Sequence, residues 1–188
     1  MIRLIYTFMV AAFLVSCKQE AADLTATTPE TAMTPTSDTP AKEGYGKVTL
    51  KCGAQVFTVD GRCGGVTNTG EMIIAVQDKT TPAKVFTISF NTPDYPQNGK
   101  VYTVKKSDFM GEGKKPDSDI YAAFTEMTQK TQMNWSSDDQ SGTMTFQVNG
   151  NEIRCTFKDL KLQPSIVYNK ADLNQLAIAS GEITLYKN

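Results

Sequence analysis

The stretch Gly142–Lys158, GTMTFQVNGNEIRCTFK, contains the pattern that decides the fold. Polar and apolar residues alternate on both sides of Asn149-Gly150, a dipeptide that favours the type I′ turn of a β-hairpin because both residues tolerate positive φ. Counting outward from the turn gives an apolar face that pairs Val148 with Asn151, Phe146 with Ile153 and Met144 with Cys155. The other face pairs Gln147 with Glu152, Thr145 with Arg154 and Thr143 with Thr156. The stretch therefore predicts a hairpin with one face in the core and one face in water.

The same alternation begins the C-terminal three quarters of the chain. Val48, Leu50 and Cys52 alternate with polar residues, and Gly53-Ala54 is suited to a two-residue turn. That turn places Val59 opposite Val48, Phe57 opposite Leu50 and Gln55 opposite Cys52. Asp60-Gly61 and Gly64-Gly65 are expected to end this second strand.

Further strands are expected at residues 72–76, 84–90, 101–104 and 182–187, with two more between Ile120 and Trp135. Loops are expected at Thr92–Gly99, which contains two prolines, and at Lys105–Ser118. Residues 170–176 suit a short helix, and Ser180-Gly181 suggests a β-bulge. The predicted fold is all-β, an antiparallel sandwich or small barrel of about 8–10 strands with at most one short helix.

The N-terminus has the features of a secretory signal. Arg3 precedes an apolar run from Leu4 to Val15, which is shorter than the ~20 residues that a transmembrane helix needs. Leu14-Val15-Ser16-Cys17 resembles the lipobox of bacterial lipoproteins. The resemblance implies that residues 1–16 are cleaved and that Cys17 receives acyl chains such as palmitate, which would anchor the chain in a membrane.

Residues 17–44 differ in composition from the rest of the chain. They are rich in Thr, Pro, Ala and Glu with few large apolar side chains, which predicts a disordered linker ahead of an all-β domain at residues 45–188. Lys18-Gln19-Glu20, with Asp23 nearby, resembles the export signal of surface lipoproteins from Bacteroidota. The expected location is therefore the cell envelope, in the outer membrane, facing either the periplasm or the cell surface.

The domain itself resembles a family. Gly99-Lys-Val-Tyr-Thr-Val104, Gly142-Thr-Met-Thr-Phe146 and Ser180-Gly-Glu-Ile-Thr-Leu185 are similar, in this order, to segments of small all-β lipoproteins of Bacteroidota whose function is unknown. The resemblance spans most of residues 45–188. It implies the fold, and it supplies no catalytic residues.

Charge excludes one class of partner. The formal net charge is -1, and removal of residues 1–16 with Arg3 makes it -2. A weakly acidic chain without a cluster of Lys and Arg lacks the electrostatic attraction on which nucleic-acid affinity depends. We expect no nucleic-acid partner.

Catalytic chemistry has little support in the sequence. The chain contains no histidine, which removes the usual general base and the commonest metal ligand. Asp117 with Asp119, and Asp138 with Asp139, are the close acidic pairs, and each offers part of an oxygen-rich Ca²⁺ site. Solvated loop charges are the preferred interpretation. We therefore expect no enzyme activity, no cofactor and no metal.

Cys52, Cys63 and Cys155 remain after Cys17 in an oxidising compartment. Either all three are buried free thiols or two of them form a bridge, and the pair Cys52 and Cys63 is favoured because the two are close in sequence. Four aromatic residues could form a binding platform or belong to the core, and the core is the preferred interpretation for a domain of this size: Tyr95, Tyr121, Trp135 and Tyr168.

The sequence thus predicts a lipid-anchored envelope lipoprotein with a non-catalytic β domain. It binds another envelope protein through a sheet face or through its loops, including Thr92–Gly99 and Lys105–Ser118, or it serves a structural role. The alternative is a sandwich or barrel whose cavity binds a small apolar ligand or a glycan.

Overall fold

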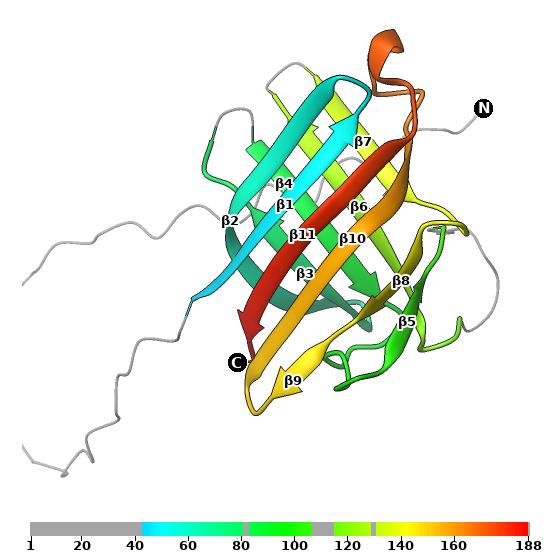
Figure 1. Ribbon diagram of the computed structural model, residues 1–188. Helices are drawn as coiled ribbons and strands as arrows, with labels where there is room; N and C mark the ends of the chain where they lie inside the picture. Colours follow the sequence, from blue (N-terminus) through cyan, green and yellow to red (C-terminus); the bar gives the residue numbers. More distant parts are fainter. Residues whose placement is uncertain (1–42, 81–82, 107–114, 129–130, 188) are drawn as a thin grey trace, which may run out of the picture. The chain divides into compact units, whose positions relative to one another are not determined.

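The structure is a computed structural model that describes residues 43–80, 83–106, 115–128 and 131–187 (Figure 1). The expected signal peptide, the lipidated Cys17 and nearly all of the linker at residues 17–44 lie outside the described residues. So do residues 107–114 of the expected loop Lys105–Ser118. Among the described residues, no helix has the length and apolar content to cross a membrane.

The chain is all-β, as predicted from the alternation of apolar residues. The described residues form eleven strands and one short 3₁₀-helix. In chain order these are β1 (Gly44–Cys52), β2 (Gln55–Asn68), β3 (Glu71–Gln77), β4 (Ala83–Phe90), β5 (Val101–Val104), β6 (Asp119–Met127), β7 (Gln132–Ser137), β8 (Gly142–Thr145), β9 (Gln147–Asn149), β10 (Glu152–Pro164), η1 (Ala171–Leu173) and β11 (Ala177–Tyr186).

Eight of the strands close into an antiparallel barrel. Following hydrogen-bonded neighbours gives the order β1-β2-β3-β4-β6-β7-β10-β11, and β11 then pairs with β1 (Figure 1). The three remaining strands are additions, because β5 pairs in parallel with β6, β8 pairs with β5, and β9 pairs with β10. Of the two predicted architectures, the structure is the barrel.

The two ends of the barrel differ in what they contain. We call the near end the one at which β1 begins, together with the β2–β3 and β9–β10 turns. The far end, at the top of Figure 1, is the one at which β1 ends, and it includes the β1–β2 turn and the long β10–β11 connection with η1. Gly44 therefore connects the barrel to the preceding residues at the near end.

Side chains fill the barrel. Alternate residues of each strand point inward, and the largest that are fully buried include Trp135, Tyr102, Phe86, Phe90, Phe124 and Phe146. Aromatic rings pack against one another along the interior. Phe86 stacks on Phe157 with ring centroids 5.2 Å apart, and Phe90 meets Tyr102 edge to face at 5.3 Å. An eight-stranded barrel is just wide enough for side chains to fill it, and here aromatic rings do so.

The first hairpin has the predicted register. Val48 pairs with Val59, Leu50 with Phe57 and Cys52 with Gln55 across the Gly53-Ala54 turn. The segment between Ile120 and Trp135 also forms two strands, β6 and β7, as predicted. In both places a short connection joins neighbouring strands, so local pattern is sufficient to fix the pairing.

The predicted end of β2 was wrong. The strand continues through Gly61, Gly64 and Gly65 to Asn68. A Cβ on Gly61 would lie 2.2 Å from the carbonyl oxygen of Gln77, and one on Gly65 would lie 3.0 Å from the Tyr95 ring. At these two positions glycine permits close approach of neighbouring chain, and it does not mark a turn.

The predicted register of the Gly142–Lys158 hairpin was also wrong. Asn149 pairs with Glu152 and Val148 with Ile153, so the two-residue turn is Gly150-Asn151 and not Asn149-Gly150. Gly150 has φ of 59° at the first central position, where type II′ turns favour glycine. The inward face is nevertheless the predicted one, with buried Met144, Phe146, Ile153 and Cys155.

The expected bulge at Ser180-Gly181 lies on the partner strand. Strand β11 is continuous, and the register shifts in β10 between Phe157 and Leu160. Within this irregularity Asp159 has φ of 55°, and its backbone N–H donates to the Ser180 hydroxyl at 3.2 Å. The sequence pattern located the irregularity but assigned it to the wrong strand of the pair.

Candidate functional site

The outer surface of the barrel has a charged side and an uncharged side. The outward positions of β1, β10 and β11 carry Lys47, Lys51, Arg154, Lys158, Lys161 and Glu182. Along β3, β4, β6 and β7, the outward positions carry no charge apart from Glu71 and Asp119, the first residues of β3 and β6. We call this set the neutral face: Ile73, Ala75, Gln77, Val85, Thr87, Ser89, Tyr121, Ala123, Thr125, Asn134 and Ser136. Depletion of charge is the compositional mark of the centre of a protein interface.

The centre of the neutral face is hollow because its side chains are small. Strand pairing aligns Ala75, Thr87, Ala123 and Ser136 in one row across the four strands. A hollow of about 310 Å³ lies over this row, lined by Thr87, Ser89, Tyr121, Ala122, Ala123, Asn134 and Ser136. Its hydroxyl and amide groups both donate and accept hydrogen bonds. The hollow is therefore suited to a neutral side chain or a polar backbone segment of a partner.

Tyr121 forms a fixed wall of the hollow. Its hydroxyl lies 2.7 Å from Asn91 Oδ1 and 3.2 Å from Glu71 Oε1, and the Lys115 ammonium lies 5.5 Å from its ring centroid. Burial, and then the Glu71 carboxylate, raises the pKa of Tyr121 to about 12. The phenol therefore stays protonated and neutral, and the Glu71 carboxylate and the Lys115 ammonium beside it lie at the edge of the neutral face.

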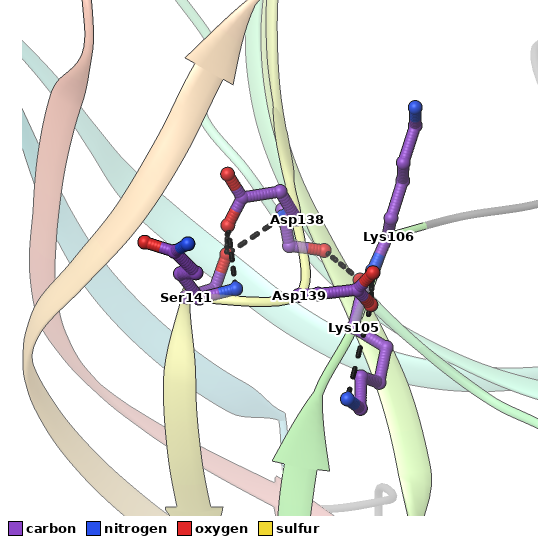
Figure 2. A network of polar contacts seen from close by, with 7 residues as sticks. Lys105, Lys106, Asp138, Asp139 and Ser141 are labelled. Atoms are coloured by element: carbon purple, nitrogen blue, oxygen red, sulfur yellow. Dashed lines mark hydrogen bonds and ion pairs between the residues drawn. The ribbon is translucent and has the colours of Figure 1, made fainter.

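The acidic pair Asp138 and Asp139 belongs to a hydrogen-bonded turn (Figure 2). Asp138 Oδ1 accepts from the backbone N–H of Gln140 at 2.8 Å, and Asp138 Oδ2 accepts from the Gln163 side chain at 2.7 Å. Burial alone would raise the pKa of Asp138, but these hydrogen bonds and one from Ser141 lower it below its ordinary value. Asp139 lies 3.8 Å from the Lys105 ammonium.

These contacts assign the pair a structural role. Both oxygens of Asp138 already accept from N–H groups, and N–H groups do not coordinate a cation. Within the described residues, no group of three or more Cys, Asp or Glu side chains is placed to hold a metal ion.

The bridge between Cys52 and Cys63 is not formed, and that prediction was wrong. The two residues lie at opposite ends of the β1–β2 hairpin, since Cys52 pairs with Gln55 and Cys63 with Gly44. Eight register positions separate them, about 26 Å at ~3.3 Å per residue, whereas a disulfide requires Cα atoms less than ~7 Å apart. Cys52, Cys63 and Cys155 are all free and buried. Burial raises the pKa of Cys63 and of Cys155 to about 12, so these thiols are not reactive.

The four aromatic residues weighed as a platform do not form one. Trp135 is fully buried, Tyr121 is buried, and Tyr95 packs against the core. Tyr168 is half exposed and lies apart from them, on the β10–β11 connection. The neutral face was missed at the sequence level because its residues come from four strands, and only the closed pairing of β4 with β6 places them together.

The fold defines the class of the chain as an all-β protein built on a closed, antiparallel eight-stranded barrel. Comparison of the chain with protein-family models, with curated proteins and with solved structures found no match.

Proposed function

We propose that the chain is a lipid-anchored lipoprotein of the cell envelope, and that its barrel docks another envelope protein through the neutral face. The observation that carries the docking proposal is the segregation of charge, which leaves the outer surface of four adjacent strands uncharged except for Glu71 and Asp119 at the near end, with a hollow at its centre. The centre of a protein interface is likewise depleted of charge and closely packed. The aromatic packing of the interior favours binding on the outside over the alternative, an apolar ligand or glycan held inside the barrel.

The proposed anchor depends on Cys17. Replacing it by alanine, Cys17→Ala, is expected to abolish acylation and to release the chain from membranes extracted at high salt, because the acyl chains supply the anchoring free energy. Mass spectrometry of the intact protein measures the acyl groups, and fractionation measures the release. A Thr28→Ala chain is the control and should stay anchored. An unmodified Cys17 in the wild-type protein would refute the anchor without affecting the docking proposal.

The docking proposal is tested at the hollow. A photo-reactive amino acid at Thr87 is expected to cross-link the partner, which mass spectrometry then identifies. Ala123 lies at the centre, paired with Thr87 and Ser136. Ala123→Arg fills the hollow and buries a charge in the interface, so the measured Kd for that partner should rise more than tenfold, which is ~1.4 kcal/mol or more.

Thr49→Arg is the matched control for that experiment. Thr49 is a partly exposed outward residue of β1, on the charged side of the barrel. We expect this variant to bind with the wild-type Kd and both variants to melt near the wild-type temperature. Unchanged affinity in Ala123→Arg, or an equal loss in Thr49→Arg, would contradict docking at the neutral face.

A further inference from the structure

The β10–β11 connection exposes three consecutive apolar side chains at the far end of the barrel. Ile166 is 79% exposed, Val167 80% and Tyr168 50%. We call these three residues the apolar tip. Leu176, which is 44% exposed, follows on the same connection. Isolated exposed apolar residues are ordinary, but a contiguous protruding group marks a binding surface.

Buried residues hold the two sides of the tip in place. Before it, the backbone N–H of Ser165 donates to the carbonyl oxygen of Asn134 at 2.9 Å. After it, the side chain of buried Asn169 accepts from the backbone N–H of Asn134 at 2.7 Å, and Leu173 packs into the core. The backbone N–H groups of Tyr168 and Asn169 also donate to Ser165. The tip is thus a preorganised projection, which lowers the entropic cost of binding.

The exposed charges around the tip are mostly positive. Within the described part of the far end, the exposed charged residues are Lys51, Lys79, Lys161, Lys170 and Asp172. Three further acids are engaged there, and one of them is Asp138, which accepts from the side chain of Gln163 at 2.7 Å. Asp78 is buried and lies 3.5 Å from the Lys84 ammonium, and Glu126 points toward the barrel mouth, where burial raises its pKa. Among the residues named here, the exposed lysines of the far end therefore outnumber its exposed acid four to one.

We propose that the far end docks on the surface of an anionic lipid bilayer. The apolar tip enters the interface between headgroups and acyl chains, where Tyr168 suits the boundary, and the lysines contact the anionic headgroups. A projecting tip can enter a bilayer because a bilayer surface is deformable. The positive charge of the surrounding lysines attracts the negatively charged headgroups. This inference is independent of both the Cys17 anchor and the neutral face.

Vesicle binding tests this inference directly. The strands close into a barrel with its own core, so residues 43–188 can be used without the anchor. We expect this barrel to sediment with vesicles of phosphatidylglycerol and phosphatidylcholine, and much less with phosphatidylcholine alone. Binding should weaken as salt is added, and Lys170→Glu should weaken it more than fivefold, since one lysine contributes about fivefold (~1 kcal/mol) and the charge is reversed.

Substitution in the tip separates insertion from charge attraction. Ile166→Ser together with Val167→Ser removes the apolar side chains without changing the charge, and it should reduce binding to anionic vesicles at least tenfold while leaving the melting temperature unchanged, because both side chains are exposed. Val66→Ser is the matched control, since Val66 is 53% exposed on β2 toward the near end. Equal binding of wild-type barrel to both kinds of vesicle, or wild-type binding by the tip variant, would overturn the proposal. So would a tip variant that loses a protein partner and keeps its vesicle binding.

Discussion

Trp135→Ala is expected to lower the free energy of unfolding by about 3–5 kcal/mol, because it removes a large side chain from a closed interior that cannot collapse around the gap. Trp135 is fully buried on β7. Its ring centroid lies 5.3 Å from that of Phe57 and 6.4 Å from that of Phe124. Three strands of the barrel therefore meet at this side chain, and a cavity here loosens all of them.

Urea unfolding followed by far-UV circular dichroism measures this loss, since the variant has no tryptophan to report fluorescence. Trp135→Phe is the companion variant. It keeps an aromatic ring against Phe57 and Phe124, and it removes an indole N–H that is buried without a hydrogen-bond partner. Its loss should be no more than about 1.5 kcal/mol, since the removed N–H offsets part of the lost volume. If Trp135→Ala costs no more than Trp135→Phe, the interior is not closely packed there.

Position on the barrel also explains why Trp135 is not a binding residue. In the sequence, Asn134-Trp135-Ser136 has no feature that separates a core tryptophan from an exposed one. The alternation of β7 places Asn134 and Ser136 on the neutral face and Trp135 inside. One strand thus contributes to both the core and the candidate site, and the site residues are the small polar neighbours of the aromatic one.

Local pattern was sufficient where the chain turns back directly on itself. Hydrophobic alternation and Gly53-Ala54 predicted the whole β1–β2 register, because the turn fixes the pairing and one face must be buried. The same reasoning placed the turn of the second hairpin at Asn149-Gly150, one residue before its actual position at Gly150-Asn151. There β8 leaves the hairpin to pair with β5, so only three residues of β9 hold the register and glycine occupies the first turn position.

The closure of the barrel could not be predicted from the pattern of neighbouring residues. The pairs that close it join segments far apart in the chain, as in Tyr45 with Thr184 and Phe86 with Phe124. The residue pattern of each segment does not specify which distant strand it pairs with. A sandwich and a barrel were therefore equally consistent with the sequence. The neutral face depends on this closure, and so does the separation of Cys52 from Cys63, which proximity in sequence had suggested were bridged.

Gly61→Ala is expected to lower the free energy of unfolding by about 2–3 kcal/mol, because the added methyl group meets backbone atoms. The new Cβ would lie 2.2 Å from the carbonyl oxygen of Gln77 and 3.0 Å from the Cα atom of Asp78, where β3 ends. Neither atom belongs to a flexible side chain, so β2 and β3 must move apart. Thermal or urea unfolding of residues 43–188 measures the loss.

Gly64→Ala, three residues further along β2, is the matched control. A Cβ at Gly64 meets nothing within 4 Å, and neither glycine has a positive φ that an alanine resists. We expect Gly64→Ala to leave stability unchanged or to raise it by up to ~1 kcal/mol, since alanine loses less backbone entropy on folding. Equal effects of the two variants would mean that β2 does not pass close to the end of β3. A turn at Gly64-Gly65, as the sequence suggested, would instead make Gly64→Ala the more damaging variant, so this pair of variants decides between a broken and a continuous β2.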